Sequence, residues 1–237
     1  MSGVVVGSRT LRLAPLARSG EHDREQGVSM RILAITPIHV GGEELKRRQE
    51  RYARLAPEGV EVTVVDLPEG APTALNTDDD VLASDEYVAE VMASSRAGFD
   101  LVLPDCVLDP AFAPSKGDDA ARGLLHQAVT SVTATGEPFG VIVRNEAIAK
   151  ELRRRLAEYG MDGSLVDVQV MDLPFEAVTN HEMWNAAMTE AVAALADRGA
   201  RSVINGCSAV DVDEEGLGVR VVDPTQEALE AMAAEAR

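Results

Sequence analysis

Short apolar runs alternate with longer charged or amphipathic stretches from Met30 to the end of the chain. The apolar runs are rich in Val, Leu and Ile and lack polar alternation, which is typical of strands buried on both faces of a parallel sheet. Several of the longer stretches have helical spacing and end at a glycine. Strands are predicted at 32–35, 60–65, 138–143, 166–170, 219–222 and before each cysteine, and helices at 43–55, 84–96, 124–135, 146–159, 186–197 and from 224 onward.

This order of elements repeats in two halves, and each half has one of the two cysteines at the same place. Cys106 and Cys207 each follow an apolar run that is preceded by a helical stretch and a glycine turn. Alternating strands and helices form parallel sheets with right-handed crossovers, and ligands bind beyond the carboxyl ends of such strands. The sequence therefore predicts an α/β fold of two doubly wound parallel-sheet lobes related by pseudo-twofold symmetry, with both thiols facing one pocket.

The chain divides into three predicted parts. Residues 1–29 are polar, contain four arginines and show no helical period, so we expect a disordered N-terminal tail. They also lack the basic start and long apolar stretch of a secretory signal. We expect the fold to begin near Met30, with 30–128 and 216–237 forming the first lobe and 129–215 the second.

The composition limits the kinds of molecule that the protein is expected to bind. With 22 basic and 40 acidic residues the net charge is −18, which argues against nucleic acid or an anionic membrane as a partner. No apolar run approaches the ~20 residues of a membrane span. Two cysteines without a dense framework fit a reducing cytoplasm rather than a disulfide scaffold. We expect a cytoplasmic protein with a small-molecule substrate, and a homo-oligomer as the default assembly.

Motifs for metals and dinucleotides are absent from the sequence. There is no C-x-x-C, and the four histidines, at 22, 39, 126 and 181, lack metal-ligand spacing. No G-x-G-x-x-G or P-loop is present either. We therefore expect no metal site.

Two matched thiols suit proton transfer at carbon. Inverting a stereocentre beside a carbonyl needs a base on one face and an acid on the other, and a thiolate and a thiol can fill these roles. A free cysteine has a pKa near ~8.5, and we expect backbone amides at the strand ends to lower it towards neutrality and to hold the enolate oxygen. The alternative is that each cysteine is a small buried hydrophobe, but their equivalent positions favour a chemical role.

Four segments carry a family resemblance. Phe99–Pro110 resembles the first cysteine motif of the hydantoin and Asp/Glu racemase superfamily, and 199–207 resembles the second. Arg31–Pro37 resembles its first strand, and 221–224 resembles the motif that precedes its last helix. The resemblance covers about residues 30 to 237. It implies an aspartate/hydantoin racemase-like fold and a cofactor-independent racemase or epimerase of hydantoin- or amino-acid-like substrates. Cys106 and Cys207 would then be the catalytic acid and base.

Several turns depart from the family's pattern, so we expect an unusual substrate. Thr36-Pro-Ile-His39 stands where hydantoin-type members have Asn-Pro-Asn-Thr, and Arg144-Asn145 stands in place of hydroxyl residues. Arg144 could bind a carboxylate in a bidentate manner or lie on the surface, and His39 could donate to a substrate carbonyl or serve only its loop. The candidate substrate-binding residues are Pro37, His39, Asp105, Val107, Arg144, Asn145, Gly206 and Ser208.

Other functions remain open at this level. A thiolate can add to a double bond and allow cis–trans isomerisation, as in maleate isomerase relatives. A single cysteine can reprotonate a carbanion after decarboxylation, although two cysteines argue against that pattern. A non-catalytic binding protein on the same fold is the third alternative.

Overall fold

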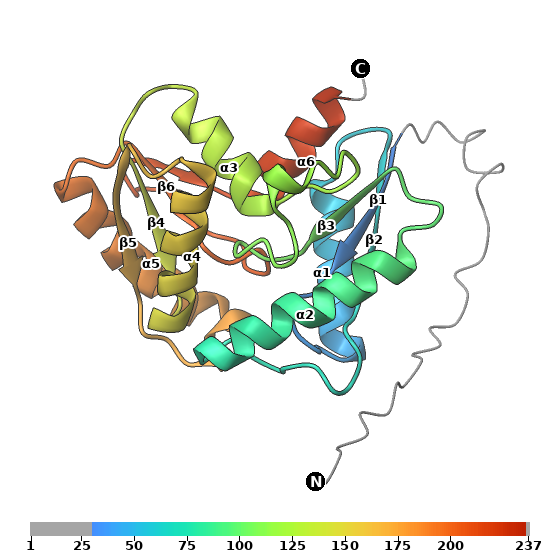
Figure 1. Cartoon of the computed structure of the whole chain (residues 1–237). Coiled ribbons are helices and arrows are strands. Elements are labelled where there is room, and N and C mark those ends of the chain that lie inside the picture. The colour runs from blue at the N-terminus through green and yellow to red at the C-terminus, as the bar shows by residue number, and fades with distance from the viewer. Residues whose placement is uncertain (1–29, 236–237) are drawn as a thin grey trace, which may run out of the picture.

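The computed structural model describes residues 30–235, which form two parallel sheets (Figure 1). The predicted N-terminal tail, residues 1–29, lies outside the described residues. The first sheet has the strand order β2-β1-β3, and the second has the order β5-β4-β6-β7. The strands are β1 (Met30–Ile35), β2 (Val60–Val65), β3 (Leu101–Pro104), β4 (Phe139–Val143), β5 (Leu165–Val170), β6 (Ser202–Asn205) and β7 (Arg220–Val222).

Helices connect these strands in the predicted alternation. They are α1 (Gly42–Leu55), α2 (Asp78–Ser95), α3 (Leu124–Thr133), α4 (Glu146–Tyr159), α5 (His181–Asp197) and α6 (Pro224–Glu235), with short 3-10 turns at Pro114–Lys116 and Phe175–Thr179. No helix in the described range 30–235 is long and apolar enough to cross a membrane.

The two sheets repeat one topology. β1 pairs with β2 and β3, and β4 pairs in the same way with β5 and β6, always in parallel. β1, β3, β4 and β6 are almost wholly buried, as their apolar runs predict. The prediction of an α/β fold with two parallel-sheet lobes is confirmed. Cys106 follows β3 and Cys207 follows β6, so the thiols do occupy equivalent strand ends.

The predicted lobe boundaries need correction at two places. The segment 216–237 was assigned to the first lobe, but β7 lies in it and pairs with β6 in the second sheet. Only α6 returns to the first lobe, where Leu229 and Met232 share a core with β1 and β2. The boundary at 128/129 also falls inside α3, because this helix is one uninterrupted element.

The helix that was predicted at 84–96 begins six residues earlier, at Asp78. Thr77 is its N-cap: its hydroxyl accepts from the Asp80 amide, and the Asp80 carboxylate accepts from the Thr77 amide. Three consecutive aspartates, Asp78 to Asp80, are common in loops, but here they form the first turn of α2. In that position their negative charges interact favourably with the positive end of the helix dipole.

One hydrophobic core joins the lobes. It contains Ile38 and the Cys106–Leu108 turn of the first lobe together with Val141 and Ile148 of the second. The carboxyl ends of β3 and β6 therefore meet at a packed junction, and this is where the candidate site lies.

Candidate active site

A cavity of about 60 Å³ opens at this junction, and both cysteines line it. Eight of the ten residues predicted for the site share its wall: Cys106, Cys207, Pro37, Asp105, Val107, Arg144, Gly206 and Ser208. Most of the remaining wall is apolar, with Ile38, Leu75, Leu108, Ile148, Phe175, Val178 and Trp184. Such a site admits a small ligand held by few polar groups.

The other two predicted residues, His39 and Asn145, are not among the residues that line the cavity. His39 Nδ1 lies 2.8 Å from the Leu67 carbonyl oxygen and 3.1 Å from Asp66 Oδ2. Asn145 caps α4 by accepting from the Ile148 amide and donates to the Leu75 carbonyl. Both side chains shape the loops around the cavity, so the structure supports a positioning role for them rather than direct contact with a ligand.

Cys106 lies in a tight turn after β3. It is buried, and the Leu108 amide donates to its sulfur at 3.4 Å. Burial raises the pKa of Cys106 to about 12, and the nearby charges of Asp105 and Asp109 act in the same direction. The resting thiol is therefore protonated at neutral pH.

Cys207 is partly exposed and has a different electrostatic environment. Its pKa is also raised by burial, but the Ala209 amide and the guanidinium groups of Arg48 and Arg51 oppose this effect. The sequence argument expected both pKa values to fall towards neutrality, which is wrong for this structure because desolvation outweighs the amides at both positions.

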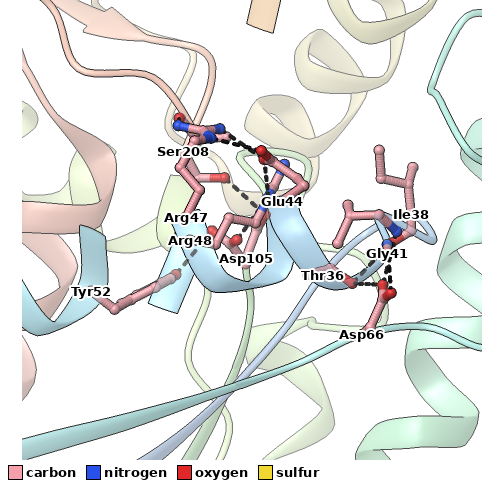
Figure 2. Close-up of polar contacts among 12 residues, drawn as sticks. Thr36, Ile38, Gly41, Glu44, Arg47, Arg48, Tyr52, Asp66, Asp105 and Ser208 are labelled. Atoms are coloured by element: carbon pink, nitrogen blue, oxygen red, sulfur yellow. Dashed lines mark hydrogen bonds and ion pairs between the residues drawn. The ribbon is translucent and has the colours of Figure 1, made fainter. Parts of the chain in front are cut away.

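Asp105 forms a buried ion pair with Arg48 and also contacts Ser208 (Figure 2). Arg48 Nη1 donates to Asp105 Oδ2 at 2.6 Å, and the Tyr52 hydroxyl donates to Asp105 Oδ1 at 2.9 Å. The Ser208 hydroxyl, next to Cys207, donates to the Asp105 carbonyl at 2.8 Å. Asp105 precedes Cys106, so one residue fixes the position of both turns, and Glu44 completes the pairing of Arg48.

Arg144 follows β4 and is almost wholly buried, at 5% exposure. Its guanidinium donates to the carbonyls of Leu75 and Leu173 and to the Asn76 side-chain oxygen, all of them uncharged. Burial lowers the pKa of Arg144. A desolvated cation held only by neutral acceptors suits an anionic ligand, because an anion would compensate its charge.

Sequence reasoning missed several residues of the site. Arg48 is one of three consecutive basic residues in the helix predicted at 43–55, and nothing in its spacing distinguishes it from Lys46 and Arg47. Trp184 is four residues from Met188, a spacing that indicates packing on one helix face; both are fully buried, but Trp184 also lines the cavity. One signal was available for Arg48. Its helix, α1, directly follows the turn at the carboxyl end of β1, where ligands of parallel sheets bind.

Metal or cofactor ligands do not cluster here. Within residues 30–235, no group of three or more His, Cys, Asp or Glu side chains is arranged to hold a metal ion. The polar groups around the cavity are two thiols, two guanidiniums, one carboxylate, one hydroxyl and one indole N–H. These groups suit acid–base chemistry on a small organic molecule.

The fold and the site define a two-lobed α/β protein with a thiol at the end of one strand in each lobe. The profile of the Asp/Glu/Hydantoin racemase family matches residues 32–232, and the chain belongs to this family. Among curated proteins, none matches the chain.

Solved structures agree on the fold. The allantoin racemase of Pseudomonas fluorescens has a TM-score of 0.73 at 16% identity, with 86% of this chain and 90% of that chain covered. The allantoin racemase of Klebsiella pneumoniae has a TM-score of 0.70 at 20% identity, with 86% of each chain covered. The aspartate racemase of Picrophilus torridus has a TM-score of 0.58 at 10% identity, with 87% and 93% covered.

Proposed function

We propose that this protein is a cofactor-independent racemase or epimerase that inverts a carbonyl-activated stereocentre by proton transfer through Cys207 and Cys106. Membership of the racemase family supports a racemase-type isomerase. The observation that carries the two-thiol mechanism is that both cysteines line one cavity from equivalent strand ends of the two lobes.

The surrounding charges distinguish the two thiols. Arg48 and Arg51 favour the thiolate of Cys207, in opposition to burial and to Asp105, whereas Asp105 and Asp109 both disfavour the thiolate of Cys106. Cys207 is then the base that removes the substrate's α-proton, and Cys106 is the acid that delivers a proton to the opposite face. After one turnover the protonation states are exchanged, and they are restored by proton exchange with water or by turnover of the opposite enantiomer.

The substrate we propose is a small hydantoin-like ring or amino-acid-like carboxylate. The adjacent carbonyl makes the α-proton acidic, and Arg144 supplies a positive charge to a carboxylate or to the developing enolate. The cavity's small volume and apolar wall favour a compact molecule.

The test is proton-to-deuterium exchange in D₂O followed by NMR, with single enantiomers of 5-substituted hydantoins, allantoin, aspartate and glutamate, and with maleate. In a two-base mechanism each cysteine removes the proton of one enantiomer. Cys207→Ala is expected to abolish exchange of one enantiomer and Cys106→Ala exchange of the other, while both variants lose inversion.

The control is Met188→Leu, a buried change of similar volume outside the cavity wall, which should retain both activities. Circular dichroism checks that each cysteine variant folds. Exchange with inversion that survives in the double variant Cys106→Ala/Cys207→Ala would refute the mechanism. Conversion of maleate alone, without α-proton exchange of the other compounds, would establish cis–trans isomerisation instead.

A further inference from the structure

Trp184 is the chain's one tryptophan, and it lies in the first turn of α5. Its side chain is fully buried, at 0% exposure. Its indole Nε1 has no hydrogen-bond partner among the described residues. Buried tryptophans usually find a partner for this N–H, because a buried donor without one loses its hydrogen bond to water and gains nothing in return.

The orphaned donor belongs to a residue of the cavity wall. Trp184 lines the same cavity as Cys106 and Cys207. The other buried side-chain N and O atoms without a partner in the described residues are on Arg31, Arg51, Arg96 and Asn205, none of which lines this cavity. Among the described residues, Trp184 is thus the one cavity-wall residue with such an unpaired group.

Packing alone does not account for tryptophan at this position. Trp184 belongs to a hydrophobic core of the second lobe, where its neighbours are apolar, among them Val178 and Met188. In such surroundings a phenylalanine or leucine would fill space without burying an unpaired donor. A buried polar group without a partner in a native protein calls for a functional explanation, and a ligand in the adjoining cavity supplies one.

We propose that the indole N–H of Trp184 donates a hydrogen bond to a carbonyl or carboxylate oxygen of the bound substrate. This inference rests on the proposed function, because it concerns the same cavity. Arg144 already has neutral hydrogen-bond partners and adds a positive charge, so the substrate's oxygen atoms meet one charged and one neutral donor. The class of substrate is therefore a compact molecule rich in acceptor oxygens, either anionic or becoming so as its α-proton leaves.

The first experiment reads the indole N–H directly. Because the chain has one tryptophan, its fluorescence and its ultraviolet resonance Raman spectrum report a single site. The probes are allantoin, 5-methylhydantoin and aspartate, added to the wild-type protein. We expect at least one probe to shift the Raman band that is sensitive to indole hydrogen bonding towards its hydrogen-bonded position. If none of the three shifts this band, the proposal is wrong.

The second experiment removes only the donor. Biosynthetic replacement of Trp184 by β-(3-benzothienyl)alanine keeps the bicyclic shape and puts sulfur in place of the N–H. For the compound that exchanges its α-proton, kcat/KM is expected to fall about tenfold or more, with Trp184→Phe falling at least as far. The matched control is again Met188→Leu, on the same face of α5 and outside the cavity wall, which should change kcat/KM by less than about twofold.

The outcomes separate the two proposals. A change of less than about twofold in the benzothienyl protein, with α-proton exchange intact, overturns the role of Trp184 and leaves the racemase standing. A Raman shift by a probe that undergoes no exchange supports the donor and counts against the racemase.

Discussion

Asp105 contacts both cysteine turns and so fixes the positions of the two thiols relative to each other. Its carboxylate is 1% exposed and accepts from Arg48 and Tyr52, while its carbonyl accepts from Ser208 beside Cys207. A buried carboxylate without a charged partner would lower the stability of the fold, so Asp105 depends on its ion pair with Arg48. The same cation opposes the rise in the pKa of Cys207.

Replacing Arg48 by methionine tests both effects of this cation. Arg48→Met leaves the Asp105 carboxylate without its charged partner, and the free energy of unfolding is expected to fall by about 3–5 kcal/mol. Without the cation the pKa of Cys207 rises further, so less thiolate is present at neutral pH. We expect kcat/KM at pH 7.5 to fall about tenfold or more, and its rise with pH to move to higher pH, as measured between pH 6.5 and 10.

Lys46→Met is the matched control, because Lys46 lies on the same helix with its side chain 79% exposed. It should leave the pH profile and the unfolding midpoint almost unchanged. An Arg48→Met protein with the wild-type pH profile would show that Arg48 does not influence the thiolate of the reacting cysteine.

The strand ends that carry the thiols depend on how closely the backbone packs there. At Gly206, between β6 and Cys207, an added Cβ would lie 2.2 Å from the Ile142 carbonyl oxygen and 2.7 Å from Val143 Cγ1. The Gly206 amide donates to that same carbonyl at 2.7 Å. Glycine is required here by the contact between neighbouring strands, not by a positive φ.

Gly206→Ala is therefore expected to push the end of β6 away from β4. The backbone oxygen cannot move aside without breaking the sheet, so we expect a loss of about 1–3 kcal/mol in unfolding free energy. Displacement of Cys207 should also reduce turnover by about a hundredfold, since about 1 Å of misplacement can cost that much. Gly163→Ala is the control, because a Cβ there meets nothing within 4 Å. Equal activity in the two variants would contradict this account.

Elements and strand ends could be predicted from the sequence because their signals are local. Apolar runs of four to six residues gave the strands, and the repeated cysteine positions placed Cys106 and Cys207 correctly at equivalent ends. The start of α2 was missed because the predicted helix began at residue 84, although Thr77 and Asp80 form a capping box that marks an earlier start.

Side-chain direction and protonation could not be predicted in the same way. His39 turns to the Leu67 carbonyl and Arg48 turns to Asp105, contacts that span 28 and 57 residues of sequence. The pKa values of the thiols depend on burial between two lobes, which no local motif encodes. Residues in the turns after strands were thus correctly placed near the site, while their individual contacts were set by tertiary structure.

At the scale of the whole molecule, the chain crosses from the second lobe back to the first near its end. β7 completes the second sheet, and α6 then packs in the core of the first lobe. Because a core also contains residues of both lobes, we expect the two lobes to unfold as one cooperative unit. Since the candidate site lies at their junction, its geometry depends on both lobes being folded.

A substitution in α6 tests this coupling, because it can be observed from the opposite lobe. Leu229 is fully buried against the first sheet, while Trp184 lies in the core of the second lobe. Leu229→Ala should cost about 2–5 kcal/mol of unfolding free energy. In urea, we expect Trp184 fluorescence and far-ultraviolet circular dichroism to give coincident transitions in the wild type, and both to shift to lower urea by the same amount in the variant. A Trp184 transition that stays in place while circular dichroism becomes biphasic would mean that the lobes unfold independently, and that the site at their junction can open without loss of either fold.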